Sequence, residues 1–348
     1  MEQEHDLSIL PELILPWYQS GHRDLPWRKD RDPYHIWVSE IMLQQTRVEA
    51  VKDYYIRFLT VLPTVEALSC CDDEILHKLW EGLGYYSRVR NLKKAAQVIM
   101  NDFGGSFPRT HKEVLSLPGV GPYTAGAICS IAYDLPTPAV DGNVLRLMSR
   151  LCNDNRPIDL PDTRKEVTEA LAQIYPREAG YFTQALMELG ATICGPNREP
   201  ECSQCPLREI CQARAAGTAV SLPIKSPKKP RKQQDLTVFI LKCGDCYALQ
   251  KRPDKGLLAD LWQFPNMEGR LNAQQVIAQA ETWGLHPREL QKQLVRTHIF
   301  THIQWNMEGY YLEVTSKGNE FKWFTTEEIH QQAALPTAFR QFFAEIED

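Results

Sequence analysis

The sequence predicts a multidomain protein in which an all-α domain is followed by an α+β domain. Its first 190 or so residues carry helical apolar spacing and no convincing alternating strand. A Pro- and Lys-rich stretch at 222–232 has the composition of an extended linker. Beyond it, two apolar runs flank Gly244-Asp245, which reads as a two-residue hairpin turn, and later segments mix strands with helices.

Composition sets the broad class. A chain of 348 residues has room for two or three domains, and 43% hydrophobic with 24% charged residues is typical of soluble globular proteins. The net charge of −5 is weak evidence against a polyanion partner, because binding depends on local patches such as Arg88, Arg90, Lys93 and Lys94. The acidic N-terminus resembles no signal peptide, so we expect a cytoplasmic protein with no membrane partner. Its ten cysteines are then expected to be reduced.

The helical domain begins with a predicted helix over 8–18, a break near Trp27, and a second helix from Pro33. Thr46 to Glu49 matches a capping box, which predicts a third helix from there to about residue 62. Glu40 lies near the end of the second helix in apolar company, which raises the pKa of a carboxyl by desolvation. A lone glutamate is more often solvated, so this position alone leaves both readings open. Further helices are expected at 73–81 and 87–101.

A glycine-punctuated turn follows, in which Gly119 and Gly121 separate two short helices. Thr110 to Glu113 is a capping box opening the first helix, and Pro122 suits the first position of the second. Both glycines allow positive φ, so the N–H groups around Val120 can point together at an anion such as a nucleic-acid phosphate. The alternative is an ordinary loop between two helices.

The region after this turn holds an acid and a cysteine group. Asp141 sits at the start of a helix predicted from Asn143, where the dipole and free N–H groups favour the ionised carboxylate. Two more helices are expected at 162–175 and 178–193. Four cysteines then fall within eighteen residues, at Cys194, Cys202, Cys205 and Cys211. One compact run of four favours an iron–sulfur loop, with zinc as the alternative.

Together, the glycine turn, Asp141 and the cysteines resemble the helix-hairpin-helix DNA glycosylases of the endonuclease III superfamily. The run from Trp37 to Thr46 resembles the catalytic helix of its MutY family of adenine DNA glycosylases. The resemblance implies a monofunctional enzyme that flips adenine out of duplex DNA when it is mispaired with 8-oxoguanine or guanine. Glu40 is then the general acid, Asp141 stabilises the oxocarbenium-like sugar, and Tyr123 and Asn143 support the pair.

The same resemblance implies further sites and a [4Fe-4S] cluster on the four cysteines. The adenine pocket is expected to comprise Trp27, Arg28, Leu43 and Gln184. DNA contacts are expected from Gln45, Thr46, Tyr85, Gly119, Val120 and Gly121. The domains are expected at 1–216, 217–233 as a linker, and 234–348, the first being split into a six-helix lobe (25–133) and an iron–sulfur lobe (1–24 with 134–216). We expect a monomer that is nucleoid-associated when it acts on DNA.

The C-terminal domain resembles the Nudix-like domain of MutY proteins. Hydrolytic Nudix domains bind magnesium through a Glu-rich helix, whereas the corresponding helix here keeps only Glu281, so we expect binding without hydrolysis. Phe300, Thr301 and His302 match the family loop that reaches 8-oxoguanine, with threonine in place of serine. Cys243 and Cys246 flank the hairpin turn and are expected to face each other, with a redox or metal role the less favoured reading.

Two other functions remain open. In bifunctional relatives a lysine occupies the place of Tyr123 and attacks the sugar, and a phenol cannot do so. This opposes an endonuclease III-like glycosylase and lyase. A non-catalytic iron–sulfur DNA-binding protein is opposed by the presence of both Glu40 and Asp141.

Overall fold

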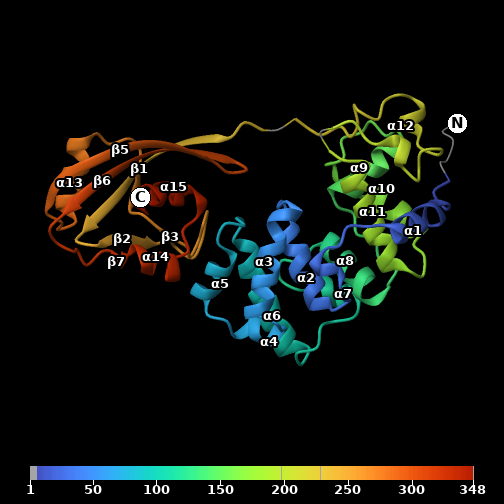
Figure 1. Cartoon of the computed structure of the whole chain (residues 1–348), viewed down its shortest axis with the longest axis horizontal. Helices are drawn as coiled ribbons and strands as arrows, with labels where there is room; N and C mark the ends of the chain where they lie inside the picture. Colours follow the sequence, from blue (N-terminus) through green and yellow to red (C-terminus); the bar gives the residue numbers. More distant parts are fainter. Residues whose placement is uncertain (1–5, 197, 228, 348) are drawn as a thin grey trace. The chain divides into compact units, whose positions relative to one another are not determined.

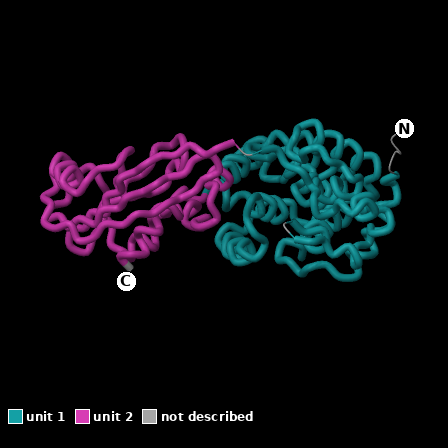
Figure 2. Tube along the Cα trace, turned by 90° about the horizontal axis from the view of Figure 1, so that it is seen from above, with its two compact units in different colours: residues 1–70, 91–227 teal, residues 71–90, 228–348 magenta. Residues whose placement is uncertain are grey.

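The computed structural model describes residues 6–196, 198–227 and 229–347. The chain forms two compact units, Met1–Cys70 with Asn91–Pro227 and Cys71–Arg90 with Lys228–Asp348 (Figure 2). Residues 71–90 are predicted from the sequence to lie in the helical lobe, whereas their contacts group them with the C-terminal segment. The predicted domain boundaries remain a prediction. No helix in these described ranges is long and apolar enough to cross a membrane.

The first unit is helical, as the sequence predicts (Figure 1). Its longer helices are α1 (Leu10–Ser20), α2 (Pro33–Leu43), α3 (Val48–Val61), α8 (Pro122–Tyr133), α9 (Gly142–Leu151), α10 (Pro161–Ala172) and α11 (Ala179–Thr192). Short helices are η1 (Pro26–Arg28), α4 (Val65–Cys70), α7 (His111–Leu115), η2 (Cys202–Gln204) and α12 (Gln212–Ala215). Helix α6 (Ser87–Asp102) is shared by both units.

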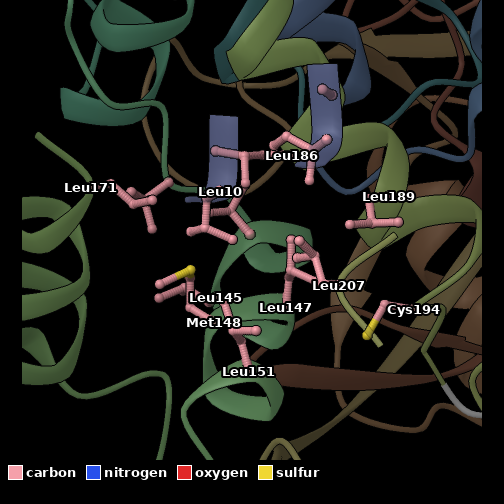
Figure 3. Packing of buried hydrophobic residues seen from close by; sticks show 14 of the residues in the cluster. Leu10, Leu145, Leu147, Met148, Leu151, Leu171, Leu186, Leu189, Cys194 and Leu207 are labelled. Carbon is pink, nitrogen blue, oxygen red and sulfur yellow. The ribbon is translucent and has the colours of Figure 1, made fainter. Parts of the chain in front are cut away.

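One core joins the start of the chain to helices far along it. Buried side chains of α1 pack with those of α9, α10 and α11, including Leu10, Leu145 and Leu186 (Figure 3). Cys194 and Leu207 belong to the same cluster, so the cysteine loop lies against this core. Helix α2 is buried on nearly all sides, which places any polar residue in its second half out of water.

Of the two capping boxes predicted from the sequence, one is present in the structure and the other is not. The capping box at Thr110 is present, since Thr110 Oγ1 accepts from Glu113 N and the Glu113 side chain accepts from Thr110 N. The capping box predicted at Thr46 is wrong, because α3 begins after Arg47 without a side-chain cap. Gln45 has φ +59°, and after this left-handed turn Thr46 Oγ1 donates to Gln44 O instead.

Two parts of the predicted linker contribute to the structure of the units that they connect. Arg150 Nε donates to Leu222 O at 2.9 Å, and Ser226 N donates to Asp159 Oδ1 at 2.9 Å, so residues 222–226 are held by the first unit. Strand β1 already begins at Lys232. Lys228, in the middle of the predicted linker, lies outside the described residues.

The second unit is an α+β layer structure (Figure 1). Its strands are β1 (Lys232–Cys243), β2 (Cys246–Lys251), β3 (Trp262–Gln263), β4 (Asn266–Glu268), β5 (Pro287–Ile299), β6 (Ile303–Val314) and β7 (Lys322–Thr325). The sheet runs β3-β2-β1-β6-β5, with β1 and β6 parallel, while β4 pairs with β1 and β7 with β2. Its helices are α5 (Asp73–Trp80), α13 (Ala273–Thr282), α14 (Thr326–Gln332) and α15 (Thr337–Glu347).

Alternation along β1 builds two cores, one on each face of the sheet. Leu236, Val238 and Ile240 pack with α14 and α15, whereas Phe239 and Leu241 pack with α13. The predicted hairpin is present, with Cys243 and Cys246 as direct register partners across the turn.

Candidate active site and iron–sulfur loop

A cavity of about 950 Å³ in the first unit collects most of the predicted site. Its walls come from η1, α2, the glycine turn, α8, the start of α9, and α11. The predicted residues that line it are Trp27, Arg28, Glu40, Leu43, Gln45, Thr46, Gly119, Gly121, Tyr123, Asp141, Asn143 and Gln184. A cavity of this size, lined in part by polar side chains, has room for a small-molecule ligand.

Glu40 projects into this cavity from a helix that is otherwise buried. Its exposed fraction is 5%, and Tyr123 OH donates a hydrogen bond to its Oε2. Burial raises the pKa of Glu40 to about 7, an effect that the charge of Asp141 reinforces and that the Tyr123 hydrogen bond and the charge of Arg28 oppose. A carboxyl with this pKa holds its proton up to neutral pH, as the sequence predicts for a general acid.

Asp141 caps helix α9 and is held through both oxygens. Its Oδ1 accepts from the backbone N–H of Asn143 (2.9 Å) and of Val144 (2.8 Å), and its Oδ2 accepts from Asn143 Nδ2 at 2.6 Å. Arg146 Nη2 donates to Asn143 Oδ1 at 2.8 Å, which fixes the orientation of that amide. The carboxylate is therefore aimed by three donors.

The hydrogen bonds at the start of α9 favour the ionised form of Asp141, as the sequence predicts, since each of them lowers its pKa. Burial has the larger, opposite effect, so the pKa of Asp141 lies above its usual value. The cause is desolvation by the cavity walls, which come from segments far apart in sequence.

Sequence reasoning missed a buried ion cluster behind this site. Glu188 on α11 accepts from Arg23 Nε and Arg28 Nη2, each at 2.8 Å, and both arginines line the cavity. Burial alone would raise the pKa of Glu188, but the arginines lower it to about 2. One local signal was available, since Glu188 follows Gln184 by one helical turn and so lies on the same face.

The glycine turn has the predicted helix-hairpin-helix form in part. Gly119 has φ +76°, and a Cβ there would lie 2.6 Å from Asn91 Cβ, so both backbone conformation and packing require glycine. Gly121 differs from expectation, with φ −99° as the N-cap of α8. Val120 N donates to Leu117 O at 3.1 Å, so that N–H is not available to a phosphate. Val120 itself is buried and does not line the cavity.

The remaining DNA-reading candidates lie together in the second unit. Phe300, Thr301 and His302 form the turn between β5 and β6, and Thr301 and His302 are exposed. The hydroxyls of Tyr85 and Thr301 are 3.0 Å apart. Tyr85 is 47% exposed and has φ +48°, an unusual conformation for a residue with a Cβ. Tyr85 therefore lies next to Thr301, in the loop that the sequence predicts to contact 8-oxoguanine.

All four cysteines of the compact run line a second, small and apolar cavity, and none of them is in a disulfide. Arg150 Nη1 lies 3.2 Å from Cys194 Sγ, and burial raises the pKa of the Cys205 thiol to about 12, with the other three sulfurs adding to the rise. Four clustered thiols in an apolar cavity would need bound cations to ionise together, which fits an iron–sulfur cluster.

Among the described residues, no group of three or more His, Cys, Asp or Glu side chains is gathered closely enough to hold one ion. The loop between Cys194 and Cys202 includes Asn197, which lies outside the described residues.

Comparison with known proteins gives two family matches. Residues 38–177 match the HhH-GPD superfamily of base excision DNA repair proteins, and residues 237–345 match the NUDIX domain. Among curated proteins, the adenine DNA glycosylases of Rattus norvegicus and Homo sapiens are 34% and 35% identical. These alignments cover 99% and 95% of this chain and 79% and 72% of those proteins.

Two solved structures resemble part of the chain. A thermostable thymine-DNA glycosylase aligns with a TM-score of 0.54 at 31% identity, covering 60% of this chain and 96% of that one. Endonuclease III in a non-covalent DNA complex aligns with a TM-score of 0.50 at 23% identity, covering 60% and 97%, which supports the fold alone.

Proposed function

The chain belongs to the adenine DNA glycosylases of the HhH-GPD superfamily, which are hydrolases of N-glycosidic bonds, and we propose that it excises adenine paired with 8-oxoguanine or guanine in duplex DNA. One observation carries the proposal: a buried carboxyl with a pKa of about 7, on Glu40, lines the same cavity as the carboxyl of Asp141. Cleavage of an N-glycosidic bond needs a proton for the leaving base and negative charge beside the cationic sugar.

The roles follow from the two environments. Glu40 keeps its proton because it is desolvated, and it delivers that proton to N7 of the flipped adenine. Three N–H donors favour the ionised form of Asp141 against the opposite effect of burial, and its carboxylate stabilises the oxocarbenium-like sugar. The flipped base would be enclosed by Trp27, Arg28, Leu43 and Gln184. Tyr123 cannot form a Schiff base, so the reaction ends at the abasic site.

The cysteine loop and the C-terminal loop complete the proposal. A [4Fe-4S] cluster would be bound by Cys194, Cys202, Cys205 and Cys211. Its role would be structural, since it would fix the loop against the core that contains α9. Phe300, Thr301 and His302 would read the 8-oxoguanine strand, with Tyr85 inserting between bases beside them. The enzyme would act as a monomer.

A three-substrate assay tests this function. The purified protein is incubated with duplexes that hold adenine opposite 8-oxoguanine, adenine opposite guanine, or thymine glycol, with and without alkali. We expect adenine excision that yields strand breaks only after alkali. Excision of thymine glycol with strand cleavage before alkali would indicate an endonuclease III-like lyase, and binding without excision at any pH would indicate a non-catalytic DNA-binding protein.

A further inference from the structure

Glu188 is a buried acid that the mechanism above leaves without a role. Its side chain is 2% exposed, and both oxygens are engaged by the segment that leads into η1. Oε1 accepts from Arg23 Nε at 2.8 Å and from Arg23 N at 3.2 Å, and Oε2 accepts from Arg23 Nη2 and Arg28 Nη2 at 2.8 Å each. A carboxylate with four donors fixes the geometry of both arginines.

These arginines connect to the predicted adenine pocket through a ring of contacts. Arg28 Nη1 donates to Arg23 O at 3.1 Å, and the Arg28 guanidinium lies 5.6 Å from the centre of the Tyr18 ring. Tyr18 OH in turn donates to Gln184 Oε1 at 3.2 Å. Gln184 and Glu188 lie one turn apart on α11, so a single helix presents the pocket residue and the acid that holds the arginines.

Charge balance is the second consequence. Two guanidinium groups face one carboxylate here, and Tyr18 from α1 and Glu49 from α3 also act on Arg23. Around Glu40, the charged or titratable groups are Tyr123, Asp141 and Arg28, and the positive charge of Arg28 acts to lower the pKa of Glu40. If Glu188 lost its charge, Arg28 would act on Glu40 with less compensation.

We propose that Glu188 is a positioning residue, which fixes Arg23 and Arg28 in the wall of the substrate cavity and balances their charge beside Glu40. This inference rests on the proposed function, because its readout is adenine excision. Glu188 would contact neither the base nor the sugar. It would determine the shape of the pocket and the pH range in which Glu40 keeps its proton.

The test compares Glu188→Gln with Glu188→Asp in the cluster-loaded full chain, by single-turnover excision of adenine opposite 8-oxoguanine between pH 5 and 9. In Glu188→Gln, the pH above which excision declines should move down by about half a unit to one unit. The amide also accepts fewer charge-assisted bonds, so the substrate Kd should rise about tenfold. Glu188→Asp should restore the wild-type pH limit but not the full affinity, because it keeps the charge and shortens the reach.

Two further variants make the result unambiguous. Glu166 on α10 forms an exposed ion pair with Arg156, so Glu166→Gln makes the same charge change away from the cavity and should leave the pH limit unchanged. Arg23→Gln removes a positive charge from the cluster, so the limit should move up, and this variant carries the test if Glu188→Gln does not fold.

The outcomes separate the inference from the function beneath it. An unmoved pH limit in both Glu188→Gln and Arg23→Gln, with wild-type excision intact, overturns the charge-balancing role of Glu188. Absence of adenine excision by the wild-type protein at every pH overturns the proposed function instead.

Discussion

Tyr123 donates its phenolic hydrogen bond to Glu40 Oε2, which joins the first residues of α8 to the buried face of α2. Burial and the nearby carboxylates raise the pKa of Tyr123 well above its usual value, so the phenol remains a donor. A donor of this kind favours the ionised form of Glu40, against the larger opposite effect of burial. The hydrogen bond from Tyr123 therefore keeps the pKa of Glu40 below the value that burial alone would give.

The first prediction concerns Glu40→Gln. The amide keeps the shape of the side chain but has no acidic proton, so the variant should bind mispaired DNA with near wild-type affinity and lose excision by at least two decades. Gel-shift affinity and single-turnover rates measure the two effects. Glu66→Gln, an exposed change on α4, is the control. Near-normal excision by Glu40→Gln would remove Glu40 from the acid role.

The raised pKa of Glu40 also predicts a pH dependence of stability. The folded state binds this proton more tightly than the unfolded chain, whose value is 4.5, so the stabilisation is complete below about pH 4.5 and lost as pH rises towards about 7. A shift of this size corresponds to roughly 3 kcal/mol. Glu40→Gln should therefore gain stability relative to wild type across that window, as measured by urea unfolding at pH 5 and pH 8. An equal difference at both pH values would contradict a buried, titrating Glu40.

The sequence predicted much of this arrangement because its signals are local. The buried environment of Glu40 was predicted from its apolar neighbours Trp37, Ile41 and Met42. The start of α7 was predicted from the capping box of Thr110 and Glu113. The fold class, an all-helical unit with a following Nudix-like unit, is confirmed by the two family matches.

The failures have both long-range and local causes. Glu188 and Arg23 are 165 residues apart, so no local pattern could pair them. The capping box at Thr46 failed because the left-handed turn at Gln45 redirects the hydroxyl. The sequence predicted that N–H donors favour ionised Asp141, but it could not predict the larger effect of burial, which depends on cavity walls from several elements.

A lysine at position 123 should confer new chemistry. Tyr123→Lys places an amine next to Glu40 and the sugar site, where it can attack the sugar carbon and form a Schiff base. We expect weak strand cleavage and a covalent DNA adduct on borohydride treatment, visible as a band of reduced mobility in a denaturing gel. The unmodified protein under the same treatment is the control, and an adduct from it at comparable yield would argue against the monofunctional reading.

Metal analysis tests the cysteine loop. Protein prepared without oxygen should be brown, with about four iron and four sulfide per chain as expected for a [4Fe-4S] cluster. Cys205→Ser should lower the iron content and the thermal stability of the first unit, whereas Cys129→Ser, on the buried face of α8, should leave the iron content unchanged. One zinc and no iron in the wild-type protein would replace the cluster assignment with a zinc site.

The last prediction concerns the hydroxyl of Thr301, in the turn between β5 and β6. This hydroxyl lies 3.0 Å from the hydroxyl of Tyr85. 8-Oxoguanine differs from guanine by an oxygen at C8 and a hydrogen at N7, so a few polar contacts must distinguish them. A good polar contact to a base is worth roughly 1–3 kcal/mol of discrimination, or about one to two decades at 1.4 kcal/mol per decade.

Thr301→Val keeps the shape of the side chain and removes only the hydroxyl. We expect the preference for adenine opposite 8-oxoguanine over adenine opposite guanine to fall by about one to two decades, while excision opposite guanine changes little because Glu40 and Asp141 are untouched. Thr297→Val, an exposed threonine on β5, is the matched control. Single-turnover rates and affinities on the two duplexes give the ratio. If Thr301→Val keeps the full preference, lesion reading belongs to the helical unit, with Gln45 and Thr46 at the cavity wall as the residues to test next.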